Sequence, residues 1–185
     1  PLAILGSADP LNLNSTQGGQ TLQFSFNLGQ YELDEVAAYL GRPELPAAVA
    51  CSNLTRDEGT GTATCIVGPG WGQNLTLSLR VEPTDTNTAY WPVSVVSNFS
   101  VSFPLTSIVP DTLQFNWEHE QGFPPRGDVL SMSNQGELVS FGVSNFLPPS
   151  ANPALRDFVR VSLGTSYTCE VRWSKSSPTH ATCEV

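Results

Sequence analysis

The chain contains four cysteines, whose thiols are its most reactive side chains and fall into two equally spaced pairs. Cys51 and Cys65 are separated by 14 residues, and so are Cys169 and Cys183. Four cysteines allow three disulfide connectivities, and the equal spacing favours the two local bridges over free buried thiols. Each bridge would close a short loop and contribute about 3 kcal/mol of stability in the chain-entropy model.

The remaining titratable residues give little support for metal binding or catalysis. His119 and His180 lack the spacing of zinc ligands, and no CxxC motif is present. Glu118-His119-Glu120 is more typical of a solvated edge strand than of a metal site. The adjacent acids Asp34-Glu35 and Asp57-Glu58 would not converge as an acid/base pair must, and there is no GxSxG motif. We therefore expect no catalytic residues, no metal and no cofactor.

Four Asn-x-Ser/Thr sequons mark candidate sites of N-glycosylation. Their asparagines are Asn14, Asn53, Asn74 and Asn98. In three cases, those of Asn14, Asn74 and Asn98, the asparagine alternates with apolar residues and falls on the polar face of a predicted strand, where a glycan can stand in solvent. Sequons and paired cysteines together indicate a secreted or cell-surface protein.

One tripeptide resembles an adhesion signal. Arg126, Gly127 and Asp128 follow two prolines and form an integrin-type motif. In an exposed loop it would present a cation and a carboxylate to a receptor. A chance tripeptide in a turn is the interpretation that we favour.

The elements that must position these residues are strands. Within Gly61–Val81, a strand ending in Cys65 is followed by a glycine-rich turn and by the alternating segment Asn74–Val81. Leu75, Leu77 and Leu79 are expected to point to the core, with polar residues between them, which predicts a hairpin with a half-buried second strand.

Further strands are predicted along the chain. The ranges are Gln20–Phe26, Ala47–Cys51 and Val93–Phe103, with Leu113–Trp117 as an extra strand in an insertion at Asp111–Gly127. Tyr31–Leu40 is predicted to begin as a short helical turn and to continue as a strand, because acidic residues occupy its start.

The chain repeats itself. Ala63-Thr64-Cys65-Ile66-Val67 returns as Ala181-Thr182-Cys183-Glu184-Val185, and the segment from Gly19 to Phe24 matches the segment from Gly136 to Phe141. We interpret this as two copies of one β module, with domains at 1–103 and 104–185. The second copy lacks counterparts of two strands, so Val159, Val161 and Leu163 are expected to be incompletely covered unless another segment completes the core.

Composition excludes several function classes. Among 185 residues the formal net charge is −9, and Lys175 is the single lysine, so neither a nucleic-acid site nor a polybasic membrane contact is expected. No apolar run approaches the roughly 20 residues of a spanning helix. Because Pro1 is not a natural start, we expect the chain to be part of a longer protein.

The order and spacing of these motifs resemble the IPT/TIG family of immunoglobulin-like domains, which occur in plexins and related ectodomains. The residues that carry the resemblance are Gly18–Leu22, Leu40-Gly41, Ala63–Cys65 with Gly68-Pro69, and Phe99–Pro110. The second copy departs in its opening turn, which has Gly136 alone. The resemblance implies an all-β fold of tandem immunoglobulin-like sandwiches, the second incomplete, with no catalytic residues.

These observations predict a non-catalytic repeat segment of a large extracellular glycoprotein. Its role would be to space or assemble a cell-surface or fibrous structure, of which a flagellar-hair type fibre is one form. Its partners would be N-linked glycans and neighbouring domains or copies of the same protein, with no nucleic acid and no insertion into a membrane by this segment. The alternative is an adhesion or receptor ectodomain module that binds a protein partner.

Overall fold

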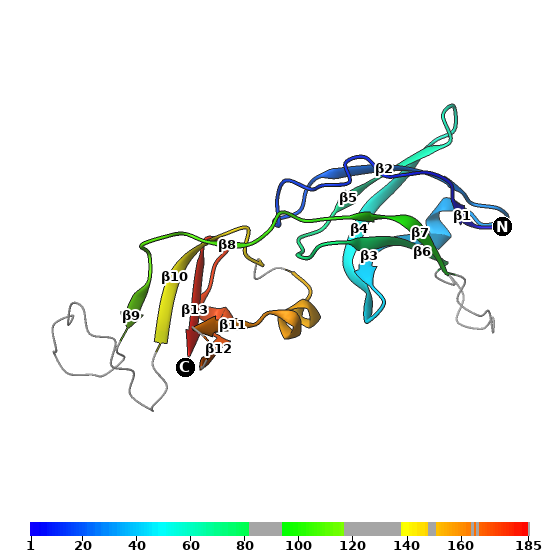
Figure 1. Ribbon diagram of the computed structural model, residues 1–185. Helices are drawn as coiled ribbons and strands as arrows, with labels where there is room; N and C mark the ends of the chain where they lie inside the picture. The colour runs from blue at the N-terminus through cyan, green and yellow to red at the C-terminus, as the bar shows by residue number, and fades with distance from the viewer. Residues whose placement is uncertain (82–93, 117–137, 148–150, 164, 166, 185) are drawn as a thin grey trace. The chain divides into compact units, whose positions relative to one another are not determined.

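The computed structural model of the protein describes residues 1–81, 94–116, 138–147, 151–163, 165 and 167–184 (Figure 1). The chain forms two compact units. Unit 1 comprises Pro1–Leu105 and Ser150–Arg156, and unit 2 comprises Thr106–Pro149 and Asp157–Val185. All paired strands within the described sheets are antiparallel, so the expected all-β, immunoglobulin-like class is confirmed. Unit 1 thus also includes Ser150–Arg156, a segment that lies within the predicted second domain at 104–185.

The described residues of Pro1–Leu105 in unit 1 form seven strands and one 3₁₀ turn. The elements are β1 (Ala3–Ile4), β2 (Thr21–Asn27), η1 (Leu33–Glu35), β3 (Val36–Arg42), β4 (Leu45–Asp57), β5 (Thr62–Val67), β6 (Leu75–Val81) and β7 (Ser94–Val101). They pair in the order β1-β2-β5-β4-β3-β6-β7. Beyond its last strand the sheet closes on itself, because Ser102 forms a parallel bridge with Asn12.

The long strand β4 joins the two halves of unit 1. Its first part pairs with β3, up to Cys51 opposite Ala38, and its second part pairs with β5. The register shifts between Ser52 and Thr55, and Asn53 there adopts a left-handed conformation with φ of 53°. Asparagine tolerates this conformation better than most residues, and such a bulge bends and twists a strand. Because β4 bends, the β3 half and the β5 half of the continuous sheet can pack their apolar faces against the same core.

The core of unit 1 is made by alternate residues of these strands. Leu22, Leu40, Leu77 and Leu79 have no exposed surface, and Phe24 is 1% exposed. Full burial of a leucine contributes about 1.5–3 kcal/mol each. The period of two predicted for β2 is therefore confirmed, with its apolar residues inside and its polar residues outside.

The predicted hairpin between the strands of Gly61–Val81 is wrong. Strand β5 pairs with β2 and β4, whereas β6 pairs with β3 and β7. The glycine-rich connection instead carries the chain from one half of the sheet to the other. It is held by backbone hydrogen bonds from Gly68 N to Ala50 O (2.8 Å) and from Gly70 N to Thr16 O (2.9 Å).

The alternation expected along β6 is only partly correct. Ser78, assigned to the polar face, is 3% exposed and lies within hydrogen-bonding distance of the carbonyl oxygens of Tyr39 and Pro46. On β7 the alternation holds here, because Ser97 has the inward parity of Val101 and is 9% exposed, whereas Val96 has the outward parity of Asn98 and is 57% exposed. At the register shift opposite Leu77, the Ser97 hydroxyl accepts the Leu77 N–H (3.0 Å) in place of a strand carbonyl.

The segment before β3 follows the sequence prediction. A 3₁₀ turn at Leu33–Glu35 leads directly into β3. The Glu35 carboxylate accepts a hydrogen bond from the Glu32 N–H (3.0 Å), which closes a capping box around the turn. The acidic residues here stabilise a chain reversal.

The described part of unit 2 contains six strands. They are β8 (Ser107–Ile108), β9 (Gln114–Asn116), β10 (Leu138–Ser144), β11 (Val161–Leu163), β12 (Tyr167–Val171) and β13 (His180–Glu184), with the 3₁₀ turn η3 (Trp173–Lys175) before β13. A further 3₁₀ turn, η2 (Pro153–Phe158), begins in the segment that belongs to unit 1 and ends in unit 2. The sheet order is β11-β12-β13-β10-β8, and β9 also pairs with β10.

The internal repeat extends to the register of the strand pairs. Leu22 lies opposite Cys65 in unit 1, and Val139 lies opposite Cys183 in unit 2. Likewise Ser52 pairs with Ile66, and Glu170 pairs with Glu184. Each of these residues is placed at the position that the sequence repeat assigns to it. The two units therefore share one strand arrangement around their cysteines.

The described start of the predicted insertion, as far as Asn116, has a structural counterpart in unit 1. Its strand β9 places Gln114 opposite Ser140, and in unit 1 Asp9 forms a bridge to Gln23. Ser140 follows Gly136 by the same number of residues as Gln23 follows Gly19. The two segments thus occupy equivalent edge positions, although their sequences do not match.

The units differ at the strand that pairs with the strand of the first cysteine, which is β3 beside β4 in unit 1 and β11 beside β12 in unit 2. In unit 1, β3 pairs with β4 on one side and with β6 on the other. In the described part of unit 2, β11 pairs with β12 alone, and Val159 and Val161 are only partly buried against the core. Ala38, the counterpart of Val161, is 2% exposed. The cover supplied by β6 in unit 1 is thus missing over these residues.

We expect the strands of unit 2 to exchange amide hydrogens faster than those of unit 1, because fewer apolar contacts protect them. Opening of β10 at Phe141–Val143 should be at least about tenfold more frequent than opening of β2 at Phe24–Phe26, equivalent to about 1.4 kcal/mol. Hydrogen exchange read by mass spectrometry on the 185-residue chain measures this. Equal protection would show that β11 needs no further cover.

The Gly70→Ala substitution should destabilise unit 1. A Cβ at this position would lie 2.4 Å from Val49 Cγ2 and 2.8 Å from Phe103 Cζ. Such overpacking typically costs about 1–3 kcal/mol. Urea unfolding measures the loss. Gly6→Ala is the matched control, because its Cβ would be 3.7 Å from its nearest neighbour, Ser25, and should leave the midpoint nearly unchanged.

Candidate functional site

The cysteines form two buried disulfides, each between neighbouring strands of one sheet. Cys51 on β4 bonds to Cys65 on β5, and Cys169 on β12 bonds to Cys183 on β13, with Cα atoms 5.4 Å apart in both. The four residues are at most 5% exposed. Thiol exchange requires access of an attacking thiolate to a sulfur atom. The buried bridges are therefore placed to hold the strands together and not to take part in redox chemistry.

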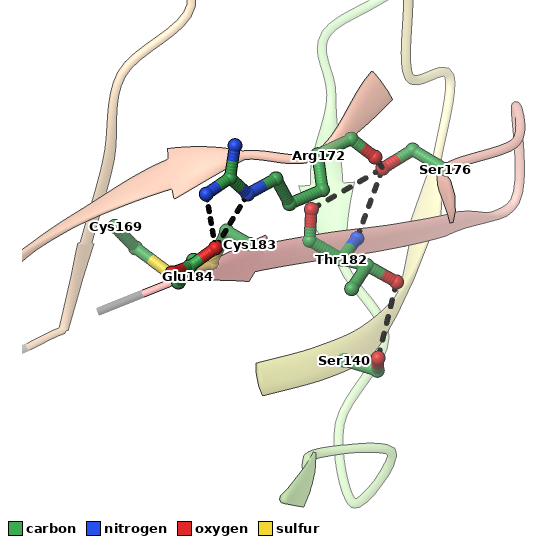
Figure 2. The surroundings of a disulfide bond; sticks show 7 residues. All are labelled: Ser140, Cys169, Arg172, Ser176, Thr182, Cys183 and Glu184. Carbon is green, nitrogen blue, oxygen red and sulfur yellow. Dashed lines mark hydrogen bonds and ion pairs between the residues drawn. A yellow bond between two sulfur atoms is a disulfide. The ribbon is translucent and has the colours of Figure 1, made fainter. Parts of the chain in front are cut away.

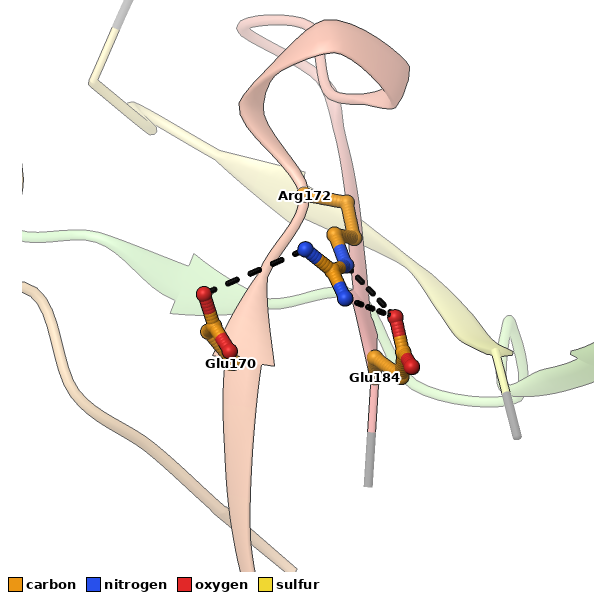
Figure 3. A network of polar contacts seen from close by, with 3 residues as sticks. All are labelled: Glu170, Arg172 and Glu184. Carbon is orange, nitrogen blue, oxygen red and sulfur yellow. Dashed lines mark hydrogen bonds and ion pairs between the residues drawn. The ribbon is translucent and has the colours of Figure 1, made fainter. Parts of the chain in front are cut away.

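A charged cluster lies beside the disulfide of unit 2. Arg172 donates from Nε to the Glu184 carboxylate (2.6 Å) and from a second nitrogen to the same oxygen, and Glu170 lies 3.9 Å from its guanidinium (Figure 3). The hydrogen bond and charge of Glu184, followed by the charge of Glu170, raise the pKa of Arg172. The group is open to solvent, so water screens the attraction. The contact joins the ends of β12 and β13.

Hydroxyl groups near this disulfide are engaged in a hydrogen-bond network. The Thr182 hydroxyl lies 3.1 Å from the buried Ser140 hydroxyl, and the Thr182 N–H donates to Ser176 Oγ (3.0 Å). Ser176 Oγ lies 3.0 Å from the carbonyl oxygen of Arg172, to which it can donate (Figure 2). A nucleophilic serine needs a base such as histidine at hydrogen-bond distance. The contacts of these hydroxyls are to other hydroxyls and to backbone groups, as in a structural network.

The acidic residues singled out from the sequence act locally. Asp57 accepts the Gly59 N–H (2.9 Å), and its pKa is lowered by hydrogen bonds from the Thr60 side chain and from Gly59. It thereby fixes the turn between β4 and β5. Within the described residues no group of three or more His, Cys, Asp or Glu side chains is placed to hold a metal ion.

Several sequence-derived candidates lie outside the described residues. They are the tripeptide Arg126, Gly127 and Asp128, and the segment Glu118-His119-Glu120. Their roles stay predictions.

The four sequon asparagines, Asn14, Asn53, Asn74 and Asn98, are all exposed. Asn53 and Asn74 both adopt left-handed backbone conformations, with φ of 53° and 56°. Sequence reasoning missed that Asn53 lies in the bulge of β4. The signal available for it was the residue type, since asparagine is enriched at such positions. Exposure makes each side chain accessible to a glycosylating enzyme.

Comparison with known proteins identifies distant structural likenesses. No model of a known protein family matches the chain, and neither does any curated protein. Two structures of the full plexin A4 extracellular region, covering domains 1 to 8 and domains 1 to 10, align with all of this chain at 14% and 15% identity. The TM-score is 0.40 in both cases, and the chain spans 15% and 13% of those chains. Likeness at this level assigns no family and no function.

Peptide mapping under non-reducing conditions should recover Cys51 linked to Cys65 and Cys169 linked to Cys183. Replacing both cysteines of one pair by alanine should lower the free energy of unfolding by about 2–4 kcal/mol, because a short loop is released in the unfolded chain. Denaturant titration of each double variant measures this. A peptide linking Cys51 to Cys169 would contradict the assignment of one bridge to each unit.

Proposed function

We propose that the chain is a non-catalytic immunoglobulin-like repeat segment of a large extracellular glycoprotein. Its role is to space or assemble a cell-surface or fibrous structure, of which a flagellar-hair type fibre is one form. The observation that carries the proposal is the repetition of one cysteine-bearing strand arrangement. Leu22 opposite Cys65 and Val139 opposite Cys183 show that the repeat conserves register and not merely composition.

The chemistry of the surface supports an extracellular setting. Two buried disulfides require an oxidising compartment during folding. Four exposed sequon asparagines and a net charge of −9 suit a hydrated, glycosylated surface. The described helices include none that is long and apolar enough to cross a membrane. The polar residues described above stabilise strands and turns, which agrees with a role in spacing or assembling a structure.

A role in binding a protein partner is the second candidate, and one surface of unit 2 favours it. Ile108, Val109 and Leu113 are 65%, 41% and 49% exposed and lie at or beside the edge strands β8 and β9. Apolar residues gathered at a sheet edge are typical of contact surfaces. An adhesion or receptor module would use such a surface to contact its partner.

Glycan occupancy tests the proposal. Protein secreted from a eukaryotic host should carry N-linked glycans at the four sequons, and enzymatic release should convert each modified asparagine to aspartate. Mass spectrometry reads the Asn-to-Asp shift site by site. We expect the clearest signal at Asn74. Secreted protein without glycan at any sequon would contradict the assignment to an extracellular glycoprotein.

A further inference from the structure

Two of the sequons lie beside Ser102, three residues before the first segment of unit 1 ends at Leu105. The Leu13 N–H donates to the Ser102 carbonyl oxygen (2.7 Å), and Asn14 follows Leu13 directly. The Asn74 N–H donates to the Ser102 hydroxyl (3.0 Å). Ser102 is thus held between two segments, each of which carries a sequon asparagine that is exposed to solvent.

The segment that carries Asn74 also anchors the next residue, Phe103. The Phe103 N–H donates to Gly72 O (2.9 Å), the Gln73 amide donates to Phe103 O, and the Phe103 side chain is 1% exposed. Two residues later, Leu105 is 72% exposed at the end of unit 1. The Thr106 hydroxyl then donates to Asn145 O (2.8 Å) within unit 2.

The connecting segment Pro104-Leu105 is therefore a short exposed stretch between two anchored ends. The chain can be followed through it from β7 to β8 (Figure 1). Exposed connecting segments are where proteolytic cleavage concentrates. The exposed Leu105 also supplies the side chain that a protease cleaving after leucine requires. Outside the cell, such a connection needs protection.

We propose that N-glycans on Asn14 and Asn74 shield this connecting segment from proteolysis. Glycans are bulky and hydrated. Their attachment points belong to the two segments that bond to Ser102, which precedes the exposed Leu105 by three residues. This inference rests on the proposed function, because it requires that the protein be glycosylated. The proposed shielding is specific to these two sequons. Asn53 takes part in none of these hydrogen bonds, so its glycan should not shield the segment.

Chymotrypsin cleavage at the Leu105–Thr106 bond tests the proposal. The full chain is secreted from a eukaryotic host as wild type, as Asn14→Asp, as Asn74→Asp and as the double variant. Product peptides are quantified over time by mass spectrometry. We expect a severalfold faster initial rate in each single variant and the fastest rate in the double variant.

The matched control is Asn53→Asp. It removes one glycan and adds one negative charge, as Asn74→Asp does, at a position whose φ of 53° is close to the 56° of Asn74. Aspartate tolerates this left-handed conformation, so neither variant should strain the backbone. The control should be cleaved at the wild-type rate. Wild-type protein from which glycans have been removed enzymatically should be cleaved as fast as the double variant, which separates loss of shielding from an effect of substitution on folding.

The outcomes are distinguishable. If all sites are glycosylated and the double variant is cleaved no faster than wild type, the shielding inference is overturned while the proposed function stands. If Asn14 and Asn74 carry no glycan but Asn53 and Asn98 do, the inference is overturned in the same way. Equal acceleration by Asn53→Asp would also overturn it. Absence of glycan from every site would remove both the inference and the proposed function.

Discussion

The register of one strand ladder sets the architecture of each unit. A cysteine on the inner face of β5 or β13 lies opposite an apolar residue of β2 or β10, and its disulfide reaches the strand on the other side. Because side chains alternate between the faces of a strand, a slip of one residue would move the cysteine and its apolar neighbours out of the core together. The bridge and the burial of residues such as Phe24 and Phe141 therefore depend on the same alignment. This dependence explains how two units with little sequence in common keep one arrangement.

Unit 1 uses irregularities of its strands to complete this arrangement. The bulge at Asn53 lets β4 serve both halves of the sheet, and asparagine tolerates the left-handed conformation found there. At the register shift between β6 and β7, the Ser97 hydroxyl accepts the Leu77 N–H that a regular ladder would have given to a backbone carbonyl. Unit 2 repeats the cysteine ladder, and within its described residues β11 pairs with β12 alone, whereas β3 of unit 1 pairs with both β4 and β6.

The polar chemistry described in the molecule serves its structure. The Arg172 guanidinium contacts carboxylates at the ends of two strands. The Ser140 and Thr182 hydroxyls contact each other, and the Asp57 carboxylate accepts a hydrogen bond that closes a turn. On the surface, four sequon asparagines stand exposed. The close association of Asn14 and Asn74 with Ser102 links that surface to the connection between the units.

The sequence alone determined the all-β class, the inner face of β2, the 3₁₀ turn before β3, and the internal repeat, because these depend on residue type and local periodicity. It also drew attention to the equal spacing of the cysteines, and the structure joins the same two pairs. The tertiary structure decided which strands pair. The turn after Cys65 was read as a hairpin, yet Gly68 and Gly70 bond to segments distant in the chain and carry β6 to the other half of the sheet. Likewise the burial of Ser78, the counterpart of Asp9 in β9, and the approach of Asn14 and Asn74 to Ser102 arise from contacts between segments far apart in sequence. Local periodicity tells which face of a strand is buried, but it holds no information about which strand or loop will cover that face.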